Sequence, residues 1–247
     1  MSENKRLPLL ILGGGYVGSR VAEKYPEARV THRNDFDLRK RSTWSAELLR
    51  VPPGSSVLWT FPAAADPLDE ALALEFFETH LKSCQVLILG TTSAYRVSVL
   101  DEWITEESEL NWDQPRTRAE EKLRQKGACI LHLAGIFGPA RDPLTWYQKG
   151  WIQAGLSDLN LIHVEDVVRV VGLLFANPQI ASQRFNLSNG QPKTHLQIIQ
   201  ELKDLGKLDS SFSLPAVKKQ DSKRIDPSKI RAFLNLPHSG WISFPET

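Results

Sequence analysis

Short apolar runs alternate with stretches of helical apolar spacing along the first half of the chain. Continuous apolar character predicts buried strands at Leu9–Leu12, Ala28–His32, Ser56–Thr60 and Gln85–Gly90. Apolar positions that recur every three or four residues predict helices over Val17–Tyr25, Trp44–Leu49 and Leu68–Leu81. Strands and helices that alternate in this way predict an α/β fold built on a doubly wound parallel sheet.

The first predicted strand leads directly into a glycine-rich turn and then into a helix. Gly13 permits a tight turn, Gly15 allows phosphates to approach the backbone, and Gly18 allows the helix to pack on the strand. The amides and the dipole at the start of that helix favour an anion. We therefore expect a dinucleotide to be bound by Gly13, Gly15, Tyr16, Val17 and Gly18. A purely structural turn before a helix is the alternative interpretation.

The end of the second predicted strand indicates which dinucleotide binds. An acidic residue about 20 positions after the first glycine binds the ribose hydroxyls of NAD, whereas an arginine accepts the 2′-phosphate of NADP. Arg33 occupies this position and favours NADP. NAD is the second choice, with Asp35 or Asp37 as its ribose ligand. The basic run Arg39–Arg41 either adds charge to the same pocket or is a solvated loop.

Candidate ligand contacts follow the third and fourth predicted strands. Phe61 and Pro62 come at the carboxyl end of the third strand, and open α/β sheets bind ligands at this edge. We expect both residues to contact the cofactor. The fourth strand runs into Thr91–Tyr95, which brings Ser93 and Tyr95 to the same edge.

The composition is ordinary for a globular protein and narrows the classes of partner. Of 247 residues, 41% are hydrophobic and 24% are charged, and the net charge is +1, so neither nucleic acid nor a membrane surface is expected as a partner. Apolar runs stay well below the roughly 20 residues of a spanning helix. No signal peptide is recognisable, and we expect a cytoplasmic protein. The histidines share no metal-binding spacing, and Cys84 and Cys129 are expected to be reduced.

Five motifs are spread over nearly the whole chain. They are Gly13-x-Gly15-x-x-Gly18, Thr92-Ser93-Ala94 with Tyr95 behind it, Leu131–Pro139, Ile162–Val167 and Lys223–Asp226. In this order they resemble the extended short-chain dehydrogenase/reductase superfamily, particularly compact atypical members of its NAD-dependent epimerase/dehydratase branch. The resemblance implies a Rossmann-type NAD(P)-binding domain over residues 1–140, to which residues 161–180 return. It further implies a reduced substrate-binding lobe over residues 141–247 and a small-molecule substrate. A homodimer is a further expectation.

The catalytic residues that the resemblance implies are only partly present. The superfamily uses a serine or threonine that binds the reacting oxygen, a tyrosine that transfers protons, and a lysine that lowers the pKa of the tyrosine. Ser93 matches the first role. No tyrosine lies between Tyr95 and Tyr147, and the tyrosine and lysine positions fall near Trp112 and Arg116. Arg116 retains the positive charge needed to bind a ribose or a phosphate, whereas an indole transfers no proton in this way.

Tyr95 is the candidate replacement for the missing tyrosine. Its hydroxyl either faces the nicotinamide pocket, where an arginine lowers its pKa, or packs against a backbone group. The acidic loop from Asp101 to Glu107 offers a carboxylate base or is simply solvated.

Two functions are compatible with these residues. The first is an atypical NADP-linked oxidoreductase or epimerase/dehydratase-like enzyme acting on a small polar or nucleotide-linked substrate, with Ser93 and Tyr95 as catalytic residues. The second is a catalytically silent NADP(H)-binding sensor or scaffold, because the usual tyrosine and lysine are absent. Binding of FAD or another nucleotide is a third possibility.

Overall fold

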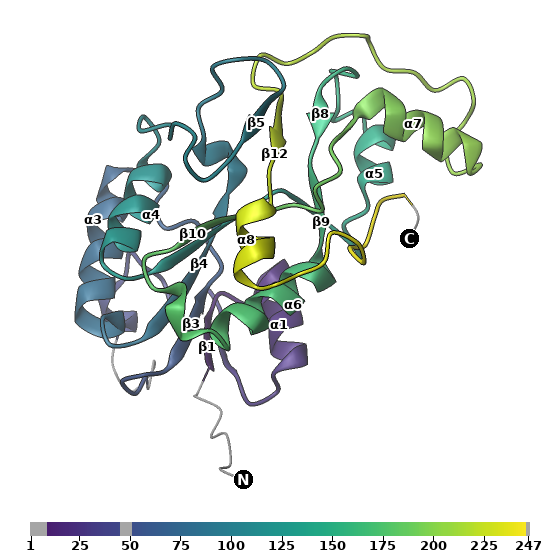
Figure 1. Ribbon diagram of the computed structural model, residues 1–247. Helices are drawn as coiled ribbons and strands as arrows, with labels where there is room; N and C mark the ends of the chain where they lie inside the picture. Colours follow the sequence, from purple (N-terminus) through teal and green to yellow (C-terminus); the bar gives the residue numbers. More distant parts are fainter. Residues whose placement is uncertain (1–8, 45–50, 246–247) are drawn as a thin grey trace. The chain divides into compact units, whose positions relative to one another are not determined.

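Six strands form the central sheet of the structure, which is a computed structural model describing residues 9–44 and 51–245. Their order is β10 (Arg184–Leu187), β6 (Cys129–Leu133), β4 (Gln85–Thr91), β3 (Ser56–Trp59), β1 (Leu9–Leu12) and β2 (Arg29–Thr31) (Figure 1). Strand β1 pairs in parallel with β2 and with β3, and β3 pairs in parallel with β4. The predicted α/β fold with a parallel sheet is confirmed.

Helices connect these strands, and shorter elements complete the chain. The helices are α1 (Tyr16–Lys24), α3 (Pro67–Phe76), α4 (Pro115–Gln125), α5 (Pro143–Gln148), α6 (Val164–Phe175), α7 (His195–Asp204) and α8 (Ser228–Phe233). The remaining strands are β5 (Glu102–Ile104), β7 (Gly135–Phe137), β8 (Asp158–Leu159), β9 (Leu161–His163), β11 (Lys193–Thr194) and β12 (Lys223–Ile225). Single 3₁₀ turns occur at Arg41–Thr43, Thr92–Ala94 and Pro178–Ile180. The helix expected over Trp44–Leu49 lies, apart from Trp44, outside the described residues.

The chain divides into two units of dense internal contact. The first unit contains the described residues of Met1–Ala94, Asn111–His132 and Val168–Arg184. The second contains those of Tyr95–Leu110, Leu133–Val167 and Phe185–Thr247. Each unit has its own hydrophobic core.

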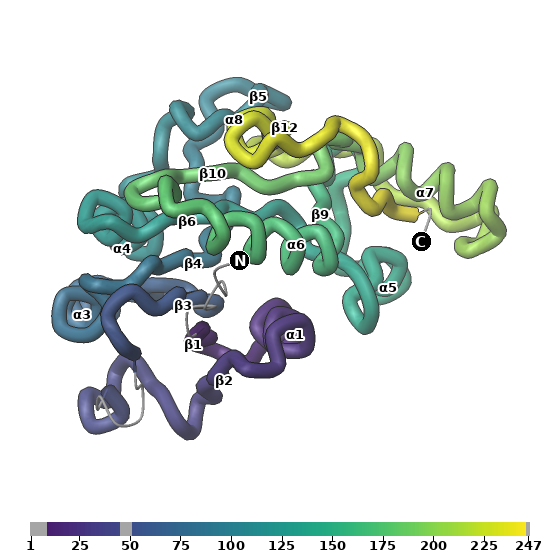
Figure 2. The backbone as a smooth tube through the Cα atoms, turned by 60° about the horizontal axis from the view of Figure 1, so that its bottom comes forward, coloured from purple at the N-terminus to yellow at the C-terminus, as the bar shows by residue number. Residues whose placement is uncertain are grey.

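Both faces of the sheet are covered in the first unit. Leu10 and Leu12 of β1 belong to the same core as Phe76 of α3 and Leu123 of α4. Ile11 points to the opposite face, where it lies against the start of α1. Figure 2 shows α3 and α4 next to each other, with α1 on the other side of β1. Burial on both faces explains why the strands are continuous apolar runs without alternation.

Helix α3 has a well-defined start and an irregular end. The Asp66 side chain accepts a hydrogen bond from the Asp69 amide, and Pro67 occupies the first turn; both features favour the beginning of a helix. The helix predicted over Leu68–Leu81 continues past Phe76 as a π-helical turn over Phe77–Leu81. Apolar spacing does not distinguish a π-helical turn from a continued α-helix. In the observed turn, Phe77 and Leu81 are buried.

The second unit contains a strand pair that the sequence did not indicate. The segment from Asp101 to Glu107 was expected to be a loop, but Glu102–Ile104 form β5, which pairs in parallel with β12. Phe137, Tyr147, Leu202 and Phe244 belong to the core of this unit.

Two further findings concern the described part of the chain. Cys84, which is half-buried, and Cys129, which is buried, are both free thiols. None of the helices described by the structure combines the length and the apolar character required to cross a membrane.

Candidate functional site

The glycine turn between β1 and α1 owes its shape to glycine at two positions. Gly13 has φ +100°, and a Cβ there would lie 2.5 Å from the hydroxyl oxygen of Thr60. A Cβ on Gly18 would lie 2.1 Å from the carbonyl oxygen of Gly13. The tight turn and the close packing of α1 therefore both exclude larger side chains.

Two threonines fix this turn, and sequence reasoning did not identify them. The amide of Gly13 donates to Thr31 Oγ1 (3.2 Å), and the amide of Gly14 donates to the Thr31 carbonyl oxygen (2.9 Å). The Thr60 hydroxyl donates to the carbonyl oxygens of Leu12 (3.0 Å) and Gly13 (2.8 Å). Each threonine stands at or just after the end of a strand adjacent to β1, and this position is the signal that would have identified both.

The start of α1 is suited to an anion. Gly15 is the N-cap, and among the described residues no side chain caps this helix and no acidic residue lies in its first turn. A Cβ on Gly15 would meet nothing within 4 Å, so the space above the backbone is open. An open backbone surface at a helix N-terminus fits a pyrophosphate group.

A cavity of about 720 Å³ opens beside the turn and lies entirely within the first unit. It brings together five of the predicted cofactor-binding residues, namely Gly13, Gly15, Arg33, Phe61 and Pro62. The other four do not line it: Tyr16, Val17 and Gly18 lie in the first turn of α1, and Arg116 lies on α4. The size of the cavity is in the range of small-molecule and cofactor sites.

The charged side chains around this cavity are mostly paired. Arg39 donates to Asp69 from Nε (2.5 Å) and Nη2 (2.9 Å), and to Asp66 from Nη2 (2.5 Å). The hydrogen bond from Arg39 lowers the pKa of Asp69. Arg41 pairs with Glu75, outside the cavity. The expected contribution of Arg39 and Arg41 to the positive charge of the pocket is therefore offset by carboxylates.

Arg33 and the two alternative ribose ligands differ in their surroundings. Arg33 is exposed and lines the cavity, and its guanidinium forms no ion pair with any residue of the described chain. Asp35 does not line the cavity, and its carboxylate accepts from the His32 amide (3.0 Å). Asp37 lines the cavity, accepts from the Arg39 amide (3.0 Å) and lies 3.8 Å from Lys40. Of the three, Arg33 is thus the one that lines the cavity without a partner among residues 9–44 and 51–245.

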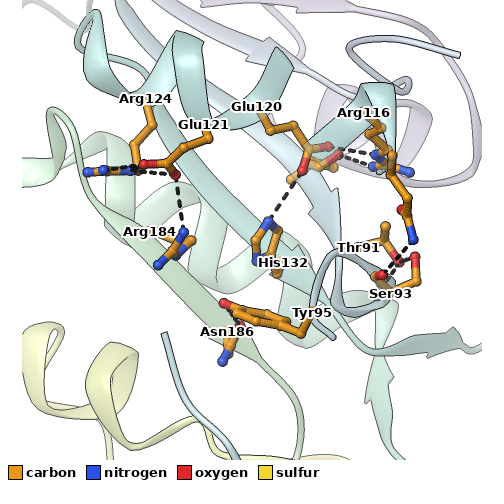
Figure 3. A network of polar contacts seen from close by, with 12 residues as sticks. Thr91, Ser93, Tyr95, Arg116, Glu120, Glu121, Arg124, His132, Arg184 and Asn186 are labelled. Atoms are coloured by element: carbon orange, nitrogen blue, oxygen red, sulfur yellow. Dashed lines mark hydrogen bonds and ion pairs between the residues drawn. The ribbon is translucent and has the colours of Figure 1, made fainter. Parts of the chain in front are cut away.

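Ser93 lies at the carboxyl end of β4, in the 3₁₀ turn Thr92–Ala94. Its hydroxyl shares a hydrogen bond with Thr91 Oγ1 (3.1 Å), and the side-chain amide of Gln114 donates to its carbonyl oxygen (3.1 Å) (Figure 3). Both contacts stabilise the turn. Ser93 is exposed and lies at the carboxyl edge of the sheet, where open α/β sheets bind ligands.

Arg116 belongs to a line of polar contacts on α4 and β6 (Figure 3). Its Nε donates to Glu120 Oε1 (2.6 Å), and its Nη2 donates to the Leu89 carbonyl oxygen (2.9 Å). The other oxygen of Glu120 lies 3.3 Å from His132 Nε2. Glu120 and His132 are both buried. Arg116 therefore has a fixed orientation.

Tyr95 lies in the second unit and is buried, with 3% of its surface exposed. Its hydroxyl donates to Asn186 Oδ1 (2.8 Å) (Figure 3). The amide of Asn186 donates to Glu106 Oε1 (2.6 Å), and burial raises the pKa of Glu106. The arrangement favours the packed alternative for Tyr95, with a side-chain amide in place of a backbone group. Glu106 is not a solvated loop residue.

Comparisons with known proteins identify the fold. No protein-family model and no curated protein matches the sequence. The Bordetella bronchiseptica enzyme WbmG, solved with NAD and UDP, superposes with TM-score 0.75 at 16% identity, over 97% of this chain and 92% of that one. RMD from Pseudomonas aeruginosa, complexed with NADPH, gives TM-score 0.71 at 15% identity, with coverages of 95% and 93%. The dTDP-glucose 4,6-dehydratase of Bacillus anthracis, in complex with NAD, gives 0.67 at 14%, with coverages of 93% and 90%.

The chain has the fold of the extended short-chain dehydrogenase/reductases. The resemblance inferred from the motifs is confirmed for the fold. Trp112 and Arg116, for which the sequence predicts places near the tyrosine and lysine of the superfamily, both belong to the first unit. Trp112 is 49% exposed, and its carbonyl oxygen accepts from Arg118 Nη1 (2.8 Å).

The second unit has a cavity of its own, of about 340 Å³. Phe137, Leu144 and Phe244 supply apolar walls, and His163 and Lys207 supply polar ones. His163 Nδ1 accepts from the Glu165 amide (3.2 Å), which fixes the orientation of the ring. No group of histidine, cysteine or acidic residues suited to a metal ion occurs in residues 9–44 and 51–245.

Proposed function

We propose that the chain binds NADP(H) in the 720 Å³ cavity of the first unit. The observation that carries this proposal is the combination of an open backbone surface at Gly15 with Arg33, an arginine on the same cavity that forms no ion pair with any described residue. The open backbone surface is suited to a pyrophosphate, and the arginine is suited to a 2′-phosphate. The complexes of the similar structures with NAD or NADPH support a nicotinamide cofactor.

The proposed contacts assign a part of the dinucleotide to each group of residues. The backbone of Gly13–Gly18 holds the pyrophosphate at the start of α1. Phe61 and Pro62 form an apolar wall of the cavity. Arg33 receives the 2′-phosphate, and Arg116, whose Nη1 has no partner among the described residues, receives the ribose.

A titration with both dinucleotides tests this assignment. We expect Arg33→Ala to weaken binding of NADPH by about tenfold or more and to change binding of NADH by less than about twofold. Arg29→Ala is the matched control, because Arg29 is also an exposed arginine, on β2, but does not line the cavity. Equal affinities of the wild type for NADPH and NADH would overturn the NADP assignment.

We infer that the reaction is that of an atypical oxidoreductase or epimerase/dehydratase-like enzyme on a small polar or nucleotide-linked substrate. A bound nicotinamide supplies hydride chemistry at this edge of the sheet. The Ser93 hydroxyl donates a hydrogen bond to the reacting oxygen of the substrate. The complex of WbmG with UDP supports a nucleotide-linked substrate. A homodimer and a cytoplasmic location stay predictions from the sequence.

Turnover of a substrate panel tests the role of Ser93. The panel consists of carbonyl compounds, alcohols and sugar nucleotides, each assayed with NADP⁺ or NADPH. Ser93→Ala should lower kcat by about a hundredfold, the size expected when one donor to a developing oxyanion is lost. Ser211→Ala, at an exposed serine of the second unit, should leave kcat unchanged. Unchanged turnover in Ser93→Ala would refute the assignment.

A catalytically silent NADP(H)-binding protein, acting as a sensor or scaffold, is the second candidate. Burial of the Tyr95 hydroxyl against Asn186 favours it, because a proton donor needs access to the substrate. Tight binding of NADPH without turnover of any member of the panel would support this function. Measurable turnover would exclude it.

A further inference from the structure

His32 follows β2 directly, and its imidazole lies against the glycine turn. A Cβ on Gly14 would lie 2.3 Å from His32 Cε1 and 2.7 Å from Nδ1, so only glycine at position 14 leaves space for the ring. The backbone of His32 is fixed as well. Its amide donates to Asp35 Oδ2 (3.0 Å), and its carbonyl oxygen accepts from the amides of Asp35 and Phe36 (2.9 Å each).

The ring of His32 is exposed and lines the same cavity as Arg33. No residue in the described ranges forms a hydrogen bond or an ion pair with its nitrogens. Two neighbouring residues therefore present polar nitrogens to the cavity, and neither side chain has a partner in the part of the chain that the structure describes. One is a guanidinium, which is a permanent cation, and the other is an imidazole, which becomes a cation when it binds a proton.

The other charged groups of this part of the first unit come from three elements. On the loop after β2, Asp35 binds the His32 amide, and Asp37 lies near Lys40. Asp66 and Asp69, at the start of α3, are bound by Arg39. On α1, Arg20 donates to the carbonyl oxygen of Tyr16 (2.9 Å). These carboxylates already have cationic or amide partners, so a ligand anion is the group still able to pair with an imidazolium ion.

We propose that His32 and Arg33 together form the phosphomonoester site of the cavity, with His32 as its titratable half. This inference rests on the proposed binding of NADP(H), and it adds a specificity-determining residue to that site. A dianionic phosphate next to the ring favours the protonated imidazole. Protonation in turn adds a charge-assisted hydrogen bond to the phosphate. Affinity for NADP⁺ should therefore rise as the pH falls, and affinity for NAD⁺ should not.

The 2′-phosphate of the ligand also changes its charge with pH. The experiment has to separate this change from the protonation of His32. A phosphomonoester has a second pKa near 6, and its protonation weakens binding to cations. This effect is identical for wild type and variant when both are titrated with the same dinucleotide. The ratio of their dissociation constants therefore reports on His32.

Calorimetric titration of wild type and His32→Gln with NADP⁺ and with NAD⁺ tests the proposal. Between about pH 8 and about pH 6, the advantage of wild type over His32→Gln for NADP⁺ should grow by about fivefold to tenfold. For NAD⁺ the ratio should stay constant. His238→Gln, at an exposed histidine of the second unit, should behave as wild type at every pH. Gly14→Ala, which displaces the ring without removing it, should lose the same pH-dependent advantage.

The possible failures are distinguishable. Wild type that binds neither dinucleotide refutes the proposed function, and the inference about His32 fails with it. Binding of NADP⁺ that is equally strong in wild type and His32→Gln at all pH values refutes the role of His32, while the cavity assignment stands. Equal weakening of NADP⁺ and NAD⁺ at all pH values also refutes it, because this pattern indicates a packing role for the ring.

Discussion

Gly18 and Gly13 are in direct contact: the position of a Cβ on Gly18 lies 2.1 Å from the carbonyl oxygen of Gly13. Gly18→Ala should therefore push α1 away from β1 and lower the free energy of unfolding by about 1–3 kcal/mol, as overpacking of a core does. Urea denaturation measures this loss. A variant as stable as wild type would show that the helix shifts without cost.

Gly15 provides the opposite case in the same turn. A Cβ there meets no protein atom within 4 Å, and the backbone has φ −75°, so Gly15→Ala should keep the free energy of unfolding within about 0.5 kcal/mol of wild type. The new methyl group instead occupies the space assigned to the pyrophosphate, and NADPH affinity should fall by about tenfold or more. Unchanged affinity would place the phosphates elsewhere. Together with Gly18→Ala, this variant separates packing from ligand binding.

Tyr95→Phe distinguishes a packed tyrosine from a catalytic one. Removing the hydroxyl leaves Asn186 Oδ1 without its 2.8 Å donor inside the second unit. An unsatisfied buried acceptor costs about 1–3 kcal/mol, so the variant should be less stable by that amount. We expect any kcat measured at a temperature where the variant is folded to remain within about threefold of wild type. A large loss of kcat with unchanged stability would instead identify Tyr95 as the proton donor.

The buried pair Tyr147 and His195 predicts a loss of stability in mild acid. The two side chains are joined by a hydrogen bond of 3.0 Å, and burial, with Lys219 nearby, lowers the pKa of His195 from 6.5 to about 4. The folded state favours the neutral ring of His195. The contribution of this ring to the free energy of unfolding is therefore complete above about pH 6.5, and up to about 3 kcal/mol of it is lost as the pH falls towards 4.

Unfolding titrations at several pH values measure this effect. In His195→Gln the amide oxygen still accepts from the Tyr147 hydroxyl, but nothing titrates at this site. The variant should therefore lose less stability than wild type between about pH 6.5 and about pH 4. Parallel curves for wild type and variant would assign the acid sensitivity to other groups.

Local patterns in the sequence were sufficient for the elements around the glycine turn. Strand β1 and the beginning of α1 agree with the predicted elements to within one residue, because buried strands and amphipathic helices have periodicities that a short window reveals. Gly13 and Gly18 could also be given their roles, because each is required by the geometry of the turn and not by a distant partner.

Long-range pairing was not predictable in this way. Arg39 was considered as a cation of the cofactor pocket, but Asp66 and Asp69, 27 and 30 residues later, take up its hydrogen bonds. Strand β5 spans three residues of a polar segment and acquires its partner, β12, only when the chain has folded. His32 was missed for the same reason, since its contact with Gly14 joins two turns that are separate in the sequence.

The three hydrogen bonds of Arg39 also affect the expected kinetics of ligand association. They tie the loop after β2 to the first turn of α3, and both Arg39 and Asp69 line the cavity. A loop anchored on both sides pays little ordering entropy when a ligand arrives. In a stopped-flow experiment, association should therefore be a single phase whose observed rate rises linearly with dinucleotide concentration, without the plateau that a slow loop closure imposes.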